Sequence, residues 1–299
     1  MKILQADFNN WHIQYAPDDG ARIAALNYKG HDLLTSHPVI FKPPDRFYGE
    51  YETRPVFGYD DCFPTVDSCT YPGSNFDCRD HGELCWQEWH TEVRGRSLIC
   101  STDCLQPAVN FKRILTFEGN RLAWRFEATS LSGEKSVFLH VMHALLPLHK
   151  ISEIEISDCM NIFDEIKSED SGLKSSADTV KHLLALQPGS FGMVLLKEIA
   201  EGFVKLRFTN GLKLEIGFNQ KLFPTLGIWW NNGGYPEGGQ LRTECAFEPI
   251  PGTCSDLSKS FRDGVYLSVE PGKPMVWEIT WEVLQNSPFE GGTGDVKRV

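Results

Sequence analysis

The sequence predicts an all-β protein, a large antiparallel β-sandwich with only a few short helices. Hairpin signals recur along the 299 residues, whereas helical periodicity is scarce. In several segments large apolar side chains also alternate with polar ones, which is typical of strands with one buried face.

The hairpin signals each consist of two apolar segments joined by a short polar turn. After an apolar segment at residues 3–8, they join residues 11–15 to 23–26, residues 111–117 to 122–128, and residues 204–208 to 212–218. The last of these turns contains Asn210-Gly211, the strongest short hairpin signal. The pairs therefore predict meanders of antiparallel strands.

The remaining segments complete the expected architecture. Residues 275–283 alternate strictly and are expected to form the closing strand, and residues 179–186 are expected to form a short helix that Pro188-Gly189 ends. Because no internal repeat or low-complexity linker divides the chain, we expect residues 1–285 to form one domain. The Gly-rich residues 286–299 are expected to be a flexible tail.

Charge and composition exclude several classes of partner. The formal net charge is −11 and there is no basic run, so we expect no binding to nucleic acid. No apolar run is long enough for a membrane helix or a signal peptide, so we expect a cytoplasmic protein that is a monomer or a homodimer and has no membrane partner. The nine cysteines contain no C-x-x-C pair, which favours free thiols and no metal site.

Three segments combine His or carboxylate residues with aromatic residues and glycine, a composition typical of a sugar site. They are residues 60–65 with residues 80–89, residues 138–146, and residues 227–234 with residues 244–257. In the second, an odd spacing separates His140 from His143, so in a strand the two point to opposite faces and only one can reach a given site.

Other features of these segments allow a structural or a functional reading. Glu248 lies between Phe247 and Pro249, where burial is unfavourable unless the carboxylate has a partner or a function. Of the consecutive Trp229 and Trp230, one ring must face away from the core and could stack on a sugar.

Two further features have ordinary structural readings. The pair Asp60-Asp61 is most often part of a solvated turn. A single His in a strand, such as His81 or His143 taken alone, is more often a core or surface residue than a catalytic one.

Taken together, the segments resemble the aldose 1-epimerase, or galactose mutarotase-like, superfamily. The resemblance rests on Asp80-His81-Gly82-Glu83-Leu84, on the strand histidine His143, and on the blocks at residues 226–234 and 247–257, and it extends over residues 5–284. It implies the large β-sandwich of that superfamily and a cofactor-free isomerase that interconverts the anomers of an aldose. It also implies that His81 contacts the sugar, His143 protonates the ring oxygen, and Glu248 takes the proton of the anomeric hydroxyl.

The resemblance also implies a set of sugar-binding residues. These are Asp80, Trp229, Asn231 and Arg54, with Arg79 as the weaker choice for the arginine. The aspartate of the galactose-specific branch has no counterpart that can be identified here, so the resemblance does not imply specificity for galactose. Because the net charge is negative, we expect a neutral sugar and not a phosphorylated one.

Two alternatives stay open at this point. The protein could be a catalytically silent sugar-binding or sensor protein, since a fold does not determine a chemistry. Alternatively, it could be a glycoside hydrolase that pairs Glu248 with Asp61 or Asp80, which would require two carboxyl groups about 5 to 9.5 Å apart.

Overall fold

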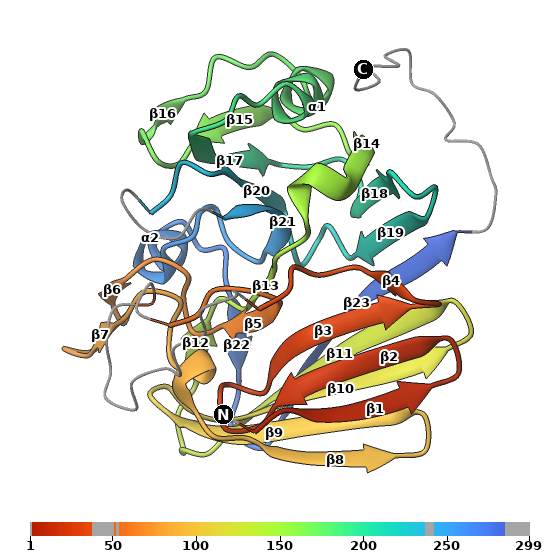
Figure 1. Cartoon of the computed structure of the whole chain (residues 1–299). Helices are drawn as coiled ribbons and strands as arrows, with labels where there is room; N and C mark the ends of the chain where they lie inside the picture. The colour runs from red at the N-terminus through yellow and green to blue at the C-terminus, as the bar shows by residue number, and fades with distance from the viewer. Residues whose placement is uncertain (1, 38–50, 52–53, 237–241, 285–299) are drawn as a thin grey trace.

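The computed structural model describes residues 2–37, 51, 54–236 and 242–284. It confirms the predicted fold class, because antiparallel sheets dominate the structure and the helices are short (Figure 1). The tail predicted at residues 286–299 lies outside the described residues.

A six-stranded sheet forms one layer of the sandwich, and most of it comes from the N-terminal third of the chain. Its order is β1-β2-β3-β5-β13, with β4 added beside β3. The strands are β1 (Leu4–Phe8), β2 (Trp11–Ala16), β3 (Arg22–Tyr28), β4 (His31–Asp32), β5 (Tyr59–Cys62) and β13 (Val141–Ala144). Figure 1 shows β1 to β3 in front of the second layer, and β5 and β13 nearer the centre of the molecule.

An eight-stranded sheet forms the second layer, in the order β14-β18-β19-β23-β11-β10-β9-β8. Its strands are β8 (His90–Arg94), β9 (Ser97–Leu105), β10 (Ala108–Glu118), β11 (Arg121–Ser130), β14 (Ile151–Ile156), β18 (Phe203–Phe208), β19 (Lys213–Phe218) and β23 (Met275–Leu284). In β10 and β11 every second side chain is buried, as the alternating sequence predicts.

A five-stranded sheet extends the sandwich, in the order β16-β15-β17-β20-β21. Its strands are β15 (Asn161–Asp164), β16 (Glu169–Asp170), β17 (Ser190–Lys197), β20 (Thr225–Asn232) and β21 (Thr243–Ile250). Two small sheets pair β6 (Cys69–Thr70) with β7 (Asp77–Cys78), and β12 (Ser136–Phe138) with β22 (Leu267–Val269). The helices are α1 (Ser176–Leu184), α2 (Leu257–Arg262) and the 3-10 turns η2 (Leu84–Trp86) and η3 (Leu148–Lys150).

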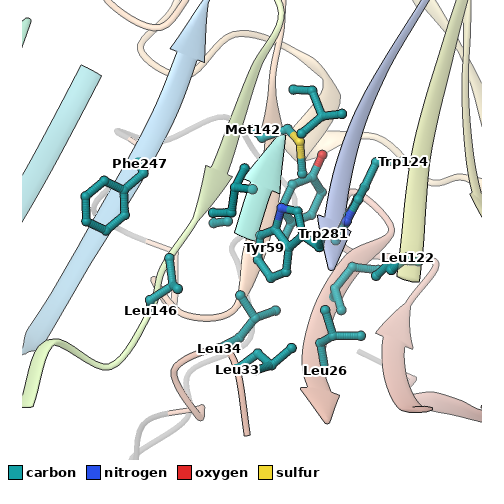
Figure 2. Packing of buried hydrophobic residues seen from close by; sticks show 14 of the residues in the cluster. Leu26, Leu33, Leu34, Tyr59, Leu122, Trp124, Met142, Leu146, Phe247 and Trp281 are labelled. Carbon is teal, nitrogen blue, oxygen red and sulfur yellow. The ribbon is translucent and has the colours of Figure 1, made fainter. Parts of the chain in front are cut away.

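One buried cluster fills the space between the layers and continues toward β21. Stacking of Phe8 on Phe117, with ring centroids 4.3 Å apart, joins β1 to β10, and the rings of Tyr59 and Trp124 join β5 to β11 at 4.7 Å. Figure 2 shows Tyr59, Trp124 and Trp281 packed together, with Phe247 of β21 at the far side of the same cluster. Burial of such large rings is a main source of stability for the sandwich.

The predicted hairpins are confirmed by the strand pairs β2-β3, β10-β11 and β18-β19, and the closing strand by β23. The apolar segment at residues 3–8 forms β1, which pairs with β2. The predicted helix is present as α1 but begins and ends earlier than expected. Ser175 caps it, because the Ser175 side chain accepts a hydrogen bond from the Asp178 backbone N–H. No described helix is long and apolar enough to cross a membrane.

The segment at residues 138–146 is not one continuous strand. β12 pairs with β22, the chain then changes sheets at residues 139–140, and β13 pairs with β5. His140 lies in this break, where its Nε2–H donates to Asp61 and its Nδ1 accepts from Trp277. The two histidines do face different environments, as expected, but because the strand breaks between them, and not because they alternate along one strand. Of the two, only His143 is among the residues that line the cavity described below.

Candidate functional site

A cavity of about 400 Å³ opens where the five-stranded sheet meets β13 and the loop around residue 81. It brings together five of the residues that the sequence singled out, which come from four separate segments of the chain. They are Asp80, His81, His143, Trp229 and Glu248. The site predicted from scattered motifs is therefore one place in the folded chain.

β13 places His143 between two strands that carry carboxylates. In the antiparallel pair of β13 with β5, His143 lies directly opposite Asp60. On the other side, Leu146 and Cys245 exchange both backbone hydrogen bonds, at 2.8 and 2.9 Å. β13 and β21 thus lie in contact, and His143 of β13 and Glu248 of β21 both line the cavity.

The Glu248 carboxyl group is buried, with only 3% of the residue exposed, and it lines the cavity. It makes no side-chain hydrogen bond to any residue that the structure describes. Burial, followed by the negative charges of Glu165 and Asp67, raises the pKa of Glu248 to about 8. Near neutral pH this carboxyl group therefore holds a proton that it can exchange with a ligand.

His143 lies in a more positive part of the same cavity. Burial lowers the pKa of the His143 imidazole well below its usual range, and the neighbouring His81 and Arg242 lower it further. Its Nδ1 lies 3.0 Å from the Tyr51 hydroxyl oxygen, and its ring lies 4.8 Å from that of His81, nearly edge to face. The free protein thus holds His143 neutral.

His81 reaches the cavity because the backbone turns sharply at this residue. Its φ of 58° lies in the left-handed region, and Gly82 follows with a φ of 69°. The His81 backbone N–H donates to the Val66 carbonyl at 2.6 Å, and its Nδ1 lies 2.8 Å from Asp80 Oδ2. These contacts fix the ring at the cavity wall, where it is partly exposed.

Aromatic rings line another part of the cavity. Trp229 lies beside Phe191 and Tyr235, with ring centroids 6.2 and 5.8 Å away, and all three line the cavity. Trp230, the next residue of β20, points the other way into the core and lies beside His182. The prediction that one of the two indole rings faces away from the core is confirmed.

The structure places the two other predicted sugar-binding residues outside the cavity. Arg54 is buried behind it, where it donates to Asp19 at 2.6 Å and lies 3.9 Å from Asp60. The Asn231 side chain accepts from the backbone N–H groups of Gly234 and Tyr235, so it shapes the turn that carries Tyr235. Both assignments are corrected accordingly. The weaker candidate, Arg79, donates to Glu83 and does not line the cavity either.

The reading of Asp60-Asp61 as a solvated turn was wrong, because both residues belong to β5 and are buried. Asp60 forms an ion pair with Arg22 at 3.0 Å on the side of the cavity. Asp61 points to the core, where it accepts from Arg113 and from His140. Asp61 therefore cannot be the second carboxylate of a hydrolase acting in this cavity.

Sequence reasoning missed four polar residues of the cavity. Tyr51, Asp67, Glu165 and Arg242 all line it. None of them belongs to a motif. Glu165 is held by the backbone N–H and the hydroxyl of Ser255, 90 residues further on.

The described side chains offer acids and bases and no cluster of metal ligands. Across the described parts of the chain, no three His, Cys, Asp or Glu side chains are arranged to hold a metal ion. The nine cysteines are free thiols.

Comparisons with known proteins find similarity at the level of the fold. No protein-family model and no curated protein matches the sequence. Among solved structures, the Slr1438 protein from Synechocystis sp. PCC 6803 has a TM-score of 0.69 at 15% identity, over 94% of this chain and 95% of that one.

Two similar structures have names that state a type of enzyme. A galactose mutarotase related enzyme from Lactobacillus acidophilus has a TM-score of 0.67 at 14% identity, over 100% of both chains. The GalM/aldose epimerase homologue from C. elegans has a TM-score of 0.64 at 13% identity, over 95% of this chain and 98% of that one. The chain therefore has the galactose mutarotase-like fold.

Proposed function

We propose that the protein is an aldose 1-epimerase, which interconverts the α and β anomers of a sugar by acid-base ring opening. One observation carries the proposal: His143 of β13 and Glu248 of β21 line the same cavity, on two strands that lie in contact. Ring opening at C1 needs one group that gives a proton and one that takes a proton, and this pair supplies them.

The reaction breaks the bond between C1 and the ring oxygen. The acid protonates the ring oxygen while the base removes the proton of the anomeric hydroxyl, which becomes the aldehyde oxygen. Rotation about the C1–C2 bond and the reverse proton transfers then close the ring as the other anomer. In the assignment that the resemblance implies, His143 Nε2 is the acid and Glu248 the base. Acid-base catalysis of this kind contributes about 10² to 10⁴-fold in rate.

The surroundings of the two groups determine where their shared proton lies. Burial and the charges of Glu165 and Asp67 raise the pKa of Glu248, whereas burial and the neighbouring His81 and Arg242 lower the pKa of His143. In the free protein near neutral pH the proton therefore resides on Glu248. The assignment with His143 as acid therefore needs this proton to have moved to His143. In the opposite assignment, Glu248 gives its proton to the ring oxygen and neutral His143 accepts from the anomeric hydroxyl.

In both assignments His143 and Glu248 together hold one exchangeable proton. The two assignments therefore produce the same bell-shaped dependence of kcat/KM on pH, limited on the alkaline side by the titration of Glu248. Infrared spectroscopy locates the proton in the free protein. If it resides on Glu248, the wild type at pH 7 must show the band of a protonated carboxyl group, and Glu248→Gln must lack this band.

The charge of the cavity supports a neutral sugar as substrate. Asp67, Glu165 and Glu244 line it, and Arg242, the one arginine among its described lining residues, lies 3.3 Å from Glu244. A phosphate group entering this site would meet several carboxylates. We therefore propose an unphosphorylated aldose.

Polarimetry on freshly dissolved α-glucose, α-galactose and glucose 6-phosphate tests the function directly. We expect the protein to speed the approach to anomeric equilibrium for at least one neutral sugar. Glu248→Gln and His143→Gln are expected to lower kcat by about 10² to 10⁴-fold and to leave sugar affinity nearly unchanged, because each group acts mainly in the transition state.

Surface variants provide the matched controls. Glu278→Gln removes a carboxylate that pairs with Arg121 on the eight-stranded sheet, and His12→Gln removes a partly exposed histidine near the N-terminus. Both should keep the wild-type rate. Saturable sugar binding without any acceleration would contradict the proposal and favour a binding protein, whereas release of new reducing ends from a glycoside would favour a hydrolase.

A further inference from the structure

Tyr51 connects the proposed acid-base pair to a buried ion pair. Only 2% of this residue is exposed, and its hydroxyl oxygen lies 3.0 Å from Asp60 Oδ2 and 3.0 Å from His143 Nδ1. The phenol ring also stacks on His81, with ring centroids 3.7 Å apart and planes 4° apart. A single side chain thus contacts both histidines of the cavity.

The direction of these hydrogen bonds follows from the partners of Asp60. Arg22 Nη1 lies 3.0 Å from Asp60 Oδ2, and this buried ion pair keeps Asp60 as a carboxylate, which can only accept hydrogen bonds. The Tyr51 hydroxyl must therefore give its one proton to Asp60. Burial also raises the pKa of Tyr51 well above its usual range, so the hydroxyl keeps that proton.

The tautomer of His143 follows in turn. Because the hydroxyl proton of Tyr51 points to Asp60, the hydroxyl oxygen faces His143 with a lone pair, and His143 Nδ1 must carry a proton and donate it. His143 Nε2 is then left to exchange protons. It makes no hydrogen bond to any other described residue, and the ring lines the cavity.

This arrangement allows proton exchange without rearrangement. His143 Nδ1 donates to Tyr51 both in the neutral ring and in the imidazolium, so gain or loss of a proton at Nε2 leaves the rest of the network unchanged. An enzyme site benefits from such preorganisation, because no hydrogen bond has to reorient during the reaction.

Resting on the function proposed above, we propose that Tyr51 is a positioning residue, which fixes His143 as the Nδ1–H tautomer and presents Nε2 to the sugar. Tyr51 acts through His143, and the Asp60–Arg22 ion pair acts through Tyr51. The sequence contains a matched control in Tyr59, whose hydroxyl donates to the buried carboxylate Asp61 in the core, outside the cavity.

The test combines a spectroscopic and a kinetic measurement on Tyr51→Phe, which keeps the ring stacked on His81 and removes only the hydroxyl. In nitrogen-15 NMR spectra, with the His143 signals assigned through His143→Gln, the wild type should show a protonated Nδ1 and an unprotonated Nε2 at neutral pH. Tyr51→Phe should shift His143 toward the Nε2–H tautomer, and Tyr59→Phe should not.

In the kinetic measurement, Tyr51→Phe should lower kcat by about tenfold to a hundredfold, part of what acid-base catalysis contributes, and change KM less than twofold. Tyr59→Phe should keep wild-type kcat even where it lowers stability. An Nε2–H tautomer in the wild type, or an unchanged tautomer or kcat in Tyr51→Phe, would overturn the proposal.

The two proposals fail in different ways. If Tyr51→Phe does not fold, the wild-type NMR spectrum alone decides the tautomer. If the wild type accelerates no sugar, the proposed function fails, while the comparison of tautomers in the wild type and Tyr51→Phe still decides whether Tyr51 positions His143.

Discussion

Gly82 lies so close to Phe63 that a Cβ atom on Gly82 would be 2.0 Å from the Phe63 carbonyl oxygen. The same carbonyl accepts a hydrogen bond of 2.7 Å from the Glu83 backbone N–H. The segment that carries His81 is thus pressed against the chain that follows β5, and only glycine leaves room for this contact. The position of His81 in the cavity depends on it.

We therefore expect Gly82→Ala to move His81 and to destabilise the fold. The clash is with backbone atoms, which cannot turn aside, and φ is 69°, so the expected loss in unfolding free energy is about 2 to 4 kcal/mol. Gly73→Ala is the control, because Gly73 has a φ of 77° but nothing lies within 4 Å of the place that a Cβ atom would take. It should lose only about 1 kcal/mol, and equal losses in urea unfolding would contradict the role of the contact.

Trp229 and Trp230 should differ in what their removal affects. Trp229→Ala removes a ring that lines the cavity and should weaken sugar binding about threefold to tenfold, as loss of an aromatic contact does. Trp230→Ala removes a core ring and should lower the free energy of unfolding by about 3 to 5 kcal/mol. Titration with the sugar that is turned over and urea unfolding measure the two effects. A larger loss of sugar affinity in Trp230→Ala would reverse the assignment.

Substitution of the two arginines near the site is also expected to have two different effects, one on KM and one on stability. Arg242 lines the cavity, so Arg242→Met should raise KM about tenfold or more, as loss of a charged hydrogen bond to a ligand does. Arg54→Met breaks the buried ion pair with Asp19 and should lower the free energy of unfolding by about 3 kcal/mol. The KM of the folded Arg54→Met protein should stay close to that of the wild type. A higher KM in Arg54→Met than in Arg242→Met would restore Arg54 as the sugar-binding arginine.

Glu248 should reduce stability at neutral and alkaline pH. The pKa of its carboxyl group is about 8 in the folded protein, against 4.5 in the ordinary, unfolded state, so between these values the folded chain holds a proton that the unfolded chain has lost. The free energy of unfolding therefore falls as pH rises through this range.

Glutamine cannot ionise, so Glu248→Gln should be as stable as the wild type at pH 4 and more stable by up to about 3 kcal/mol at pH 7. Urea unfolding at both pH values measures the difference. A difference that does not change with pH would show that Glu248 does not carry the raised pKa.

Glu165 should set part of the alkaline limit of activity. Its negative charge helps to raise the pKa of Glu248, so Glu165→Gln should move the alkaline limb of the kcat/KM profile to lower pH. Glu155→Gln removes a carboxylate that pairs with Lys205 on the eight-stranded sheet, and it should leave the pH dependence of kcat/KM unchanged. Identical limbs in Glu165→Gln and the wild type would remove Glu165 from the electrostatics of the site.

Local sequence patterns were sufficient to predict much of the fold. Hairpins such as β10-β11 and β18-β19 have their turn residues and their alternating apolar residues within one short segment, so they could be located before the structure was known. The break between β12 and β13 could not, because it depends on partners such as Asp61 and Trp277 that lie far from His140 in the sequence.

In the site too, residues within local sequence blocks could be predicted, and residues that depend on distant contacts could not. His81, His143 and Glu248 belong to recognisable blocks, and the structure places them at one cavity. Arg54 is near such a block in the sequence, but its side chain is directed to Asp19, which lies between β2 and β3. Tyr51 belongs to no block, and its role became visible only when Asp60 and His143 were seen at its two sides.

The two consecutive aspartates of β5 have a consequence for folding. Asp60 holds Arg22 on the side of the cavity, and Asp61 holds Arg113 in the core, so the strand has one counterion on each face. If β5 paired with its neighbours one residue out of step, one aspartate would take the place of the other, and the position left over would hold Tyr59 or Cys62. One of the two buried arginines would then lose its counterion. The two aspartates thus disfavour the mispaired sheet and help to keep β5 in register with β13, the strand that carries His143.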